Sequence, residues 1–244
     1  MSAHAPFLTA EWRNLILLNY RIEPAVLEPY IPLGTELDCW DGQAIISLVG
    51  FMFLKTHIAG VAIPFHTNFE EVNLRFYARH KTGSDWLRGV VFVREIVPRF
   101  AIAAVADLLY GEKYTALPMR HTLASARKTL CAGDRIEYAW KLPGKWNHLG
   151  VRITGEPQYA QPGSQEEFIT EHYWGYAAQR SGAAMKYGVE HPSWRLWQVS
   201  ETSVDCDVER MYGSRFVESL KAGPVSAFLA EGSHVAVYTG SRLT

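Results

Sequence analysis

The segment FEEVNLRFY, residues 69–77, gives the strongest indication of the fold, because polar and apolar side chains alternate from Glu71 to Phe76. Strict alternation is typical of a β-strand, because successive strand side chains point to opposite faces of a sheet. Glu71, Asn73 and Arg75 therefore share one face. If that face borders a cavity, a carboxylate, an amide and a guanidinium converge on a ligand. The default interpretation is a face toward water, because Glu and Arg side chains are seldom buried without partners.

The composition indicates a folded globular chain with a large core. Of its 244 residues, 48% are hydrophobic and 20% are charged, which is ordinary for a globular protein. We expect one domain over residues 1–244, since no linker or internal repeat interrupts the pattern. The net charge of -1, with both signs interspersed, gives no electrostatic footprint for nucleic acid or for an anionic membrane surface. Neither class of partner is expected.

The lack of a targeting signal and the pattern of cysteines favour a cytoplasmic location. The sequence has neither a signal-peptide pattern nor an apolar run of the roughly 20 residues that a membrane helix needs. Its three cysteines are odd in number, far apart and outside any CxxC pair, which fits free thiols in a reducing compartment: Cys39, Cys131 and Cys206.

Motifs for cofactors, metals and nucleophilic serine do not occur. Glycine-rich phosphate loops and the GxSxG elbow are missing from the sequence. The grouping of His57, His66 and Glu70 lacks the helical register of zinc enzymes. We therefore expect no cofactor and no metal. His191, at the mouth of a predicted strand, could titrate near neutral pH, and its role stays open.

The remaining pattern predicts an α+β fold dominated by strands. Ser164 and Glu167 form a capping box that starts a helix over residues 165–180. Further helices are expected over 24–27, 99–109 and 205–220, and a loop over 55–67. Strands are expected over 12–22, 44–53, 69–77, 87–97, 119–129, 135–141, 146–154, 194–204, 225–229 and 234–239. This alternation favours a large, mainly antiparallel, barrel-like sheet with a few packed helices.

Several segments, in order and spacing, resemble one family. They include WRNL at 12–15, DGQA at 41–44, FEEVNLR at 69–75, YGEKY at 110–114 and EHPSW at 190–194. Together they resemble the YqjF-like proteins, domain of unknown function 2071, which are similar to the acetoacetate decarboxylase superfamily. The resemblance implies a large antiparallel sheet curled into a cone-like barrel around a buried pocket.

The resemblance also implies candidate site residues. Acetoacetate decarboxylases use a lysine that forms a Schiff base with a keto acid, supported by a glutamate and an arginine. Lys113, Glu71 and Arg13 resemble these three groups. One alignment puts Lys113 at the lysine position, whereas an alignment anchored on Gly111 puts Tyr114 there. The register stays open.

The neighbours of Lys113 do not help to activate it. A Schiff-base lysine must be neutral, and a carboxylate such as Glu112 beside it favours the charged ammonium. Burial would then have to lower the lysine pKa. Glu112 and Tyr114 remain candidates for substrate contacts, together with Asn73 and Arg75.

Three functional interpretations follow. The preferred one is a pocket that binds a small carboxylate or carbonyl compound through Glu71, Asn73, Arg75 and Tyr114. The alternative is a cofactor-free Schiff-base lyase, that is a decarboxylase, aldolase or dehydratase acting on a small keto acid through Lys113. In it, Arg13 or Arg75 pairs with the substrate carboxylate and Glu71 moves protons.

The third interpretation is a scaffold. In it, Glu71 and Arg75 form a structural ion pair, and Lys113 is solvated. Exposed edges of the large sheet would also allow self-association of the chain, in a number that the sequence does not give.

Overall fold

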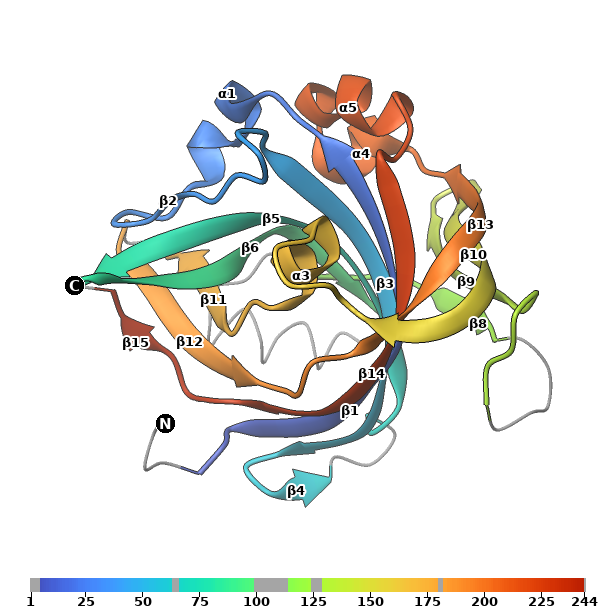
Figure 1. Ribbon diagram of the computed structural model, residues 1–244, viewed down its shortest axis with the longest axis horizontal. Coiled ribbons are helices and arrows are strands. Elements are labelled where there is room, and N and C mark those ends of the chain that lie inside the picture. Colours follow the sequence, from blue (N-terminus) through green and yellow to red (C-terminus); the bar gives the residue numbers. More distant parts are fainter. Residues whose placement is uncertain (1–4, 63–65, 99–113, 124–128, 180–181, 244) are drawn as a thin grey trace.

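The computed structural model describes residues 5–62, 66–98, 114–123, 129–179 and 182–243. A 15-stranded sheet dominates this part of the chain (Figure 1). Its described pairings are antiparallel, except that β6 pairs in parallel with β7 and with β11. The predicted large, mainly antiparallel sheet is confirmed. The helices within the described ranges are short.

Seven strands form a ring of paired neighbours. The order runs β12, β11, β6, β5, β3, β1, β14, and β14 pairs again with β12 through Val189 opposite Val237. The strands of the ring are β1 (Leu8–Arg21), β3 (Ile45–Ile58), β5 (Phe69–Thr82), β6 (Asp85–Val97), β11 (Trp174–Ala178), β12 (Ala184–Glu190) and β14 (Ser226–Val237). Each strand in this ring has a hydrogen-bonded neighbour on both sides.

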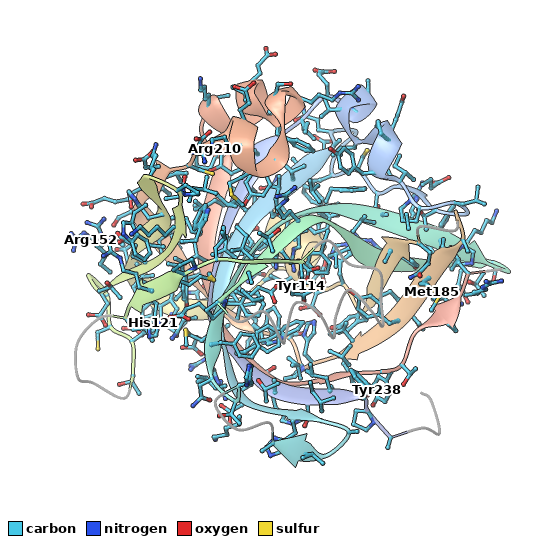
Figure 2. The ribbon with its side chains drawn as sticks, turned by 180° about the vertical axis from the view of Figure 1, so that it is seen from behind. Tyr114, His121, Arg152, Met185, Arg210 and Tyr238 are labelled. Carbon is cyan, nitrogen blue, oxygen red and sulfur yellow. The ribbon has the colours of Figure 1, made fainter. Side chains whose placement is uncertain are left out.

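The sheet also continues from β14 away from the ring, and we call this part the second arm. It consists of β13 (Arg195–Asp205), β10 (Lys145–Tyr159), β9 (Arg135–Leu142) and β8 (Met119–Thr122). Figure 2 shows His121 and Arg152 on this arm, away from Tyr114 near the ring. The short strands are β2 (Glu36–Leu37), β4 (Val61–Ala62), β7 (Tyr114–Ala116) and β15 (Ser241–Arg242).

The helices are α1 (Pro24–Leu27), η1 (Glu28–Tyr30), α3 (Gln165–Thr170), α4 (Val208–Tyr212), η2 (Ser214–Phe216) and α5 (Val217–Lys221). Pro24 stands in the first turn of α1, where its missing N–H costs no hydrogen bond. Helix α3 packs against β5, where Phe168 meets the ring of Tyr77 with centroids 5.2 Å apart. Among the described residues, no helix is long and apolar enough to span a membrane.

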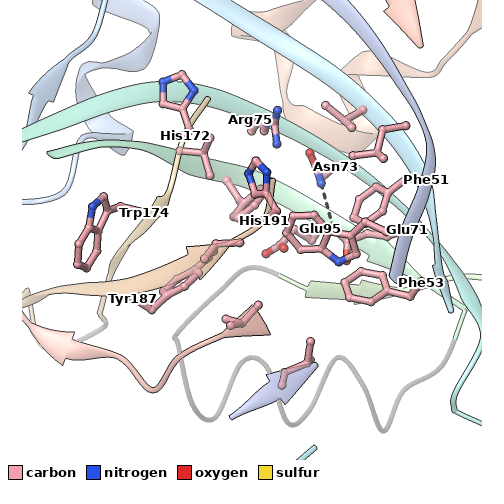
Figure 3. Close-up of a pocket in the computed structure, with 18 of the residues that line it drawn as sticks. Phe51, Phe53, Glu71, Asn73, Arg75, Glu95, His172, Trp174, Tyr187 and His191 are labelled. Atoms are coloured by element: carbon pink, nitrogen blue, oxygen red, sulfur yellow. Dashed lines mark hydrogen bonds between the residues drawn. The ribbon is translucent and has the colours of Figure 1, made fainter. Parts of the chain in front are cut away.

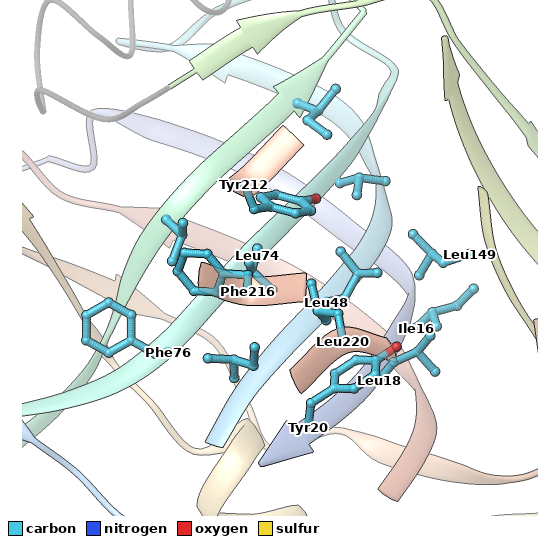
Figure 4. Packing of buried hydrophobic residues seen from close by; sticks show 14 of the residues in the cluster. Ile16, Leu18, Tyr20, Leu48, Leu74, Phe76, Leu149, Tyr212, Phe216 and Leu220 are labelled. Carbon is cyan, nitrogen blue, oxygen red and sulfur yellow. The ribbon is translucent and has the colours of Figure 1, made fainter. Parts of the chain in front are cut away.

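Strands β1, β3, β5 and β6 of the ring are buried on both faces, which explains their apolar runs. On β1, Ile16 and Leu18 belong to one hydrophobic cluster, while Leu15 and Leu17 belong to a second. Alternate side chains of a strand point to opposite faces, so the two clusters lie on the two sides of the sheet. Figure 4 shows the first cluster, where α4, η2 and α5 contribute Tyr212, Phe216 and Leu220.

The predicted helix over 165–180 is wrong beyond Thr170. The capping box is present at its start, since Ser164 Oγ accepts from the backbone N–H of Glu167 at 3.2 Å. The chain then leaves the helix, and Trp174 begins β11, which pairs with β6 and β12. Tertiary strand pairing outweighs the local helical spacing here. Gly175 permits it, because a Cβ there would collide with the Tyr187 ring.

Other boundaries also differ from the sequence prediction. The two strands expected at 225–229 and 234–239 are the single strand β14, and β3 runs through part of the expected 55–67 loop. The single helix expected over 205–220 is wrong: Asp205 still belongs to β13, and the chain then forms three short helices, α4, η2 and α5, with a break at Gly213. Strand β8 ends at Thr122. The helix expected over 99–109 and the stretch 124–128 lie outside the described residues.

Candidate functional site

A cavity of about 130 Å³ lies inside the ring of strands. Most of its wall is apolar and aromatic. Figure 3 shows a small polar group within this wall, drawn from β5, β6 and the segments beside α3 and β12. Among the described residues, the polar ones that line the cavity include Glu71, Asn73, Arg75, Glu95, Tyr114, Thr170, His172, Tyr187 and His191. Few polar groups in an apolar cavity are typical of a small-molecule site.

The polar face of β5 borders this cavity, and the default interpretation of a water-facing surface is wrong. Glu71 is 3% exposed and Asn73 is 1% exposed. Arg75, two residues further, is partly buried and also lines the cavity. The sequence pattern identified the shared face correctly. Closure of the strand ring determines that this face points into the cavity.

Glu71 is a buried carboxyl group with two hydrogen-bond donors beside it. Asn73 Nδ2 donates to Glu71 Oε1 at 2.9 Å, and Tyr114 Oη donates to Oε2 across a longer 3.5 Å. Burial raises the pKa of Glu71 to about 7, although these donors and the charge of Arg75 act in the opposite direction. At a pH below 7 the protonated carboxyl predominates, and it can donate a hydrogen bond.

Tyr114 completes the polar group from β7. Burial first, then the nearby carboxylates of Glu71 and Glu95, raise the pKa of Tyr114 well above its usual value. Its phenol therefore keeps its proton at neutral pH and serves as a donor. In the parallel pairing of β6 with β7, Tyr114 lies opposite Glu95.

Arg75 has no carboxylate partner among the described residues. Its Nη2 donates to the backbone carbonyl of Ile169 at a long 3.4 Å, and its guanidinium lies 5.8 Å from the centroid of the Tyr77 ring. Its Nε atom is buried without a hydrogen-bond partner in the described structure. The structural ion pair between Glu71 and Arg75 is therefore not formed. A partly buried guanidinium without an ion-pair contact among the described residues favours binding of an anion.

His172 extends the polar group at the end of α3. Its Nε2 lies 3.9 Å from Oδ2 of Asp38, too far for a hydrogen bond, while Arg88 Nε donates to the same oxygen at 2.6 Å. Burial lowers the pKa of His172 to about 4, so the ring is neutral near pH 7. Neither ring nitrogen has a hydrogen-bond partner among the described residues.

His191 lies in the cavity wall inside an aromatic stack. Its ring stacks on Trp194 with centroids 4.2 Å apart and on Tyr173 with centroids 4.9 Å apart. Its Nδ1 is 3.0 Å from the carbonyl oxygen of Pro192. Burial lowers the pKa of His191, which keeps the imidazole neutral at neutral pH. Its place in the wall makes it a candidate contact for a ligand.

The structure brings some of the predicted site residues together and separates another. Glu71, Asn73, Arg75 and Tyr114 all line the cavity. Arg13 does not belong to the cavity lining; its Nε donates to Glu11 Oε2 at 3.0 Å and its Nη1 to the carbonyl of Gly232 at 3.0 Å. Lys113 and Glu112 lie outside the described residues.

Sequence reasoning missed Glu95 and His172 as members of the wall. His172 recurs at helical spacing with Phe168 and Tyr176 within the helix expected over 165–180, so the sequence pattern gives it no separate role. Glu95 stands in the predicted strand 87–97, where alternation places it on one face with Val93 and Val97. This was the available signal, because a carboxylate on an apolar strand face is seldom buried without a reason. Glu95 is 2% exposed.

The mostly antiparallel sheet around this cavity resembles the folds of acetoacetate decarboxylase-like enzymes. Residues 9–234 match the model of the uncharacterized conserved protein family DUF2071, and the chain belongs to this family. A curated relative is the uncharacterized protein YqjF of Bacillus subtilis (strain 168). It is 25% identical over 189 residues, which cover 76% of this chain and 73% of that protein.

Solved structures share the fold at low sequence identity. The enduracididine biosynthesis enzyme MppR complexed with pyruvate superposes with a TM-score of 0.69 at 12% identity, covering 100% of this chain and 93% of that one. An acetoacetate decarboxylase-like enzyme from Sphingomonas wittichii RW1 gives 0.66 at 14%, covering 99% and 95%. The acetoacetate decarboxylase of Legionella pneumophila gives 0.67 at 11%, covering 98% and 88%.

Proposed function

We propose that the cavity binds a small carboxylate or carbonyl compound, and that the ring of strands is the cone-like barrel which holds it. The observation that carries this proposal is the Arg75 guanidinium, which lines the cavity with no carboxylate partner among the described residues. Ligand oxygens are the acceptors that a guanidinium recognises.

The groups beside Arg75 suit the same ligand. Burial raises the pKa of Glu71 to about 7 and that of Tyr114 well above its usual value, so both can present an O–H group at slightly acid pH. Together with Arg75 they offer donors to a carboxylate or a carbonyl oxygen. An acceptor-rich ligand fits this wall better than a cation.

The test is calorimetric titration of the protein with pyruvate, 2-oxobutyrate and butyrate at pH 6.5. We expect saturable binding that Arg75→Met weakens at least tenfold. Arg79→Met is the matched control, because Arg79 stands on the same strand but pairs with Glu36 at the protein surface. Equal affinity in the wild type and a folded Arg75→Met variant would contradict the proposal.

A second candidate is a Schiff-base lyase that uses Lys113. The observation in its favour is that the fold neighbours are enzymes, one of them complexed with pyruvate. In this scheme the Lys113 amine attacks the keto carbon and water leaves, Arg75 holds the carboxylate, and Glu71 moves protons. Arg13, which pairs with Glu11, has no part in it.

Borohydride trapping separates this candidate from simple binding. A lyase that acts through Lys113 gives a stable adduct with pyruvate, detected as a mass increase, and loses it in Lys113→Ala. Lys145→Ala is the control, since Lys145 pairs with Asp205 on the second arm. Ligand binding without any adduct would support the binding function and contradict the Schiff-base lyase.

A further inference from the structure

The carboxyl groups and the guanidinium that line the cavity, Glu71, Glu95 and Arg75, lie on the neighbouring strands β5 and β6. In the pairing of β5 with β6, Asn73 lies opposite Glu95, and in the pairing of β6 with β7, Glu95 lies opposite Tyr114. These three residues form a row across three neighbouring strands. Glu71 and Arg75 flank the row on β5. All five residues line the cavity.

An apolar row faces it from the other side of the ring. Leu8 of β1 lies opposite Val237 of β14, and Val237 lies opposite Val189 of β12. All three residues line the cavity. In the strand order, β14 is three steps from β5 through β1 and β3, and three steps from β6 through β12 and β11. The apolar row therefore stands across the ring from the polar one.

Aromatic side chains occupy the flanks between the two rows. Phe51 and Phe53 of β3 lie on one side of the polar group and Trp174 of β11 on the other (Figure 3). Phe51 is paired opposite Glu71, so the aromatic wall begins next to the polar one. The charged side chains therefore lie at one end only, while Tyr187 of β12 and His191 just after that strand bring polar atoms to the side of Val189.

We propose that the ligand is a monocarboxylic acid with a hydrophobic body, in which the carboxylate meets Arg75 and the body packs against Leu8, Val189 and Val237. This inference rests on the proposed function and adds the chemical class of the substrate. A second carboxylate would be desolvated against the apolar row without a partner, which is costly. An alkyl chain or a single aromatic ring buries apolar surface there.

The test compares 2-oxo acids that share one head group. The series is pyruvate, 2-oxobutyrate, 2-oxopentanoate and phenylpyruvate, titrated calorimetrically at pH 6.5. We expect affinity to rise by about fourfold for each added CH₂ that is buried. The dicarboxylate 2-oxoglutarate, which has the same chain length as 2-oxopentanoate, should bind at least tenfold more weakly than 2-oxopentanoate.

Variants locate the effect in the apolar row. Val237→Thr keeps the side-chain shape and replaces a methyl group with a hydroxyl, so we expect about threefold weaker binding of 2-oxopentanoate and a smaller loss for pyruvate. Val235→Thr is the control, because Val235 is buried on the same strand but is not part of the cavity lining.

The outcomes separate this inference from the function on which it rests. Absence of binding by every acid would overturn the proposed function. Equal affinity for all acids of the series, or higher affinity for 2-oxoglutarate, would contradict the proposal that the ligand has a hydrophobic body. The cavity would then be a general carboxylate site. Because the ligand series uses the wild-type chain, it decides between these outcomes even if Val237→Thr does not fold.

Discussion

Asn73 donates its side-chain amide to Glu71 Oε1 across 2.9 Å, and both side chains leave the same face of β5. A hydrogen bond of this kind stabilises the ionised carboxylate. Burial outweighs it, because Glu71 is 3% exposed, and the pKa of Glu71 is raised to about 7. The cavity thus holds an acid that changes charge near neutral pH.

Glu71→Gln should alter stability in a pH-dependent way. The folded pKa of Glu71 is about 7 and its ordinary value is 4.5, so the folded state holds this proton more tightly than the unfolded state. Stability from this group is full below pH 4.5 and is lost as the pH rises to 7. The loss is roughly 3 kcal/mol at about 1.4 kcal/mol per pKa unit. Urea unfolding should therefore show that the free energy of unfolding of Glu71→Gln, relative to that of the wild type, is higher at pH 8 than at pH 5.

The control for this measurement is Glu156→Gln, on the exposed part of β10. It should leave the pH dependence of unfolding unchanged. A stability difference between Glu71→Gln and the wild type that is the same at both pH values would contradict the raised pKa.

His172→Gln should remove a loss of stability in acid. The folded pKa of His172 is about 4 against an ordinary 6.5, so the unfolded state binds this proton first. The stability that comes from the neutral ring is present above pH 6.5 and is lost as the pH falls toward 4. We expect the unfolding free energy of the variant to fall less between pH 7 and pH 4.5 than that of the wild type. His234→Gln, an exposed site on β14, should behave as the wild type does.

Arg88→Met should destabilise the connection between β6 and α3. Arg88 Nε donates to the buried Asp38 at 2.6 Å, and its guanidinium lies 4.6 Å from the centroid of the Phe168 ring. Removing it leaves the Asp38 carboxylate buried without its main counter-charge, at a cost of about 1–3 kcal/mol. In urea unfolding, adding Asp38→Asn to Arg88→Met should restore part of the lost free energy of unfolding. Strictly additive effects of the two changes would argue against the pairing.

Gly232→Ala should weaken the pairing of β1 with β14. A Cβ at Gly232 would clash with the carbonyl oxygen of Trp12, and the residue has a φ of +78°. Gly163 has a similar φ of +76° with no atom within 4 Å of a Cβ, so Gly163→Ala measures the backbone strain alone. Thermal unfolding should give a clearly lower Tm for Gly232→Ala than for Gly163→Ala. Equal shifts would mean that the close approach of the two strands is unimportant.

Much of the strand framework could be predicted from the sequence, because alternation and apolar runs are local signals. The face shared by Glu71, Asn73 and Arg75 followed from strand geometry alone. The helix predicted over 165–180 was wrong after Thr170, because its apolar spacing suits either a helix or a strand, and only pairing with β6 and β12 decides. The exposed edges of the sheet, the single domain over residues 1–244 and the self-association of the chain stay predictions.

The sequence by itself determined a mostly β chain of the DUF2071 family and the grouping of three polar residues on one strand face. Only the tertiary structure decided that this face is buried, since closure of β14 on β12 turns one side of β5 inward. It also added Glu95 and His172 to the cavity wall and left Arg13 beside Glu11. The physical reason is that alternation fixes only relative directions along a strand. Burial and pKa depend on residues that are distant in sequence and that meet only when the sheet has closed.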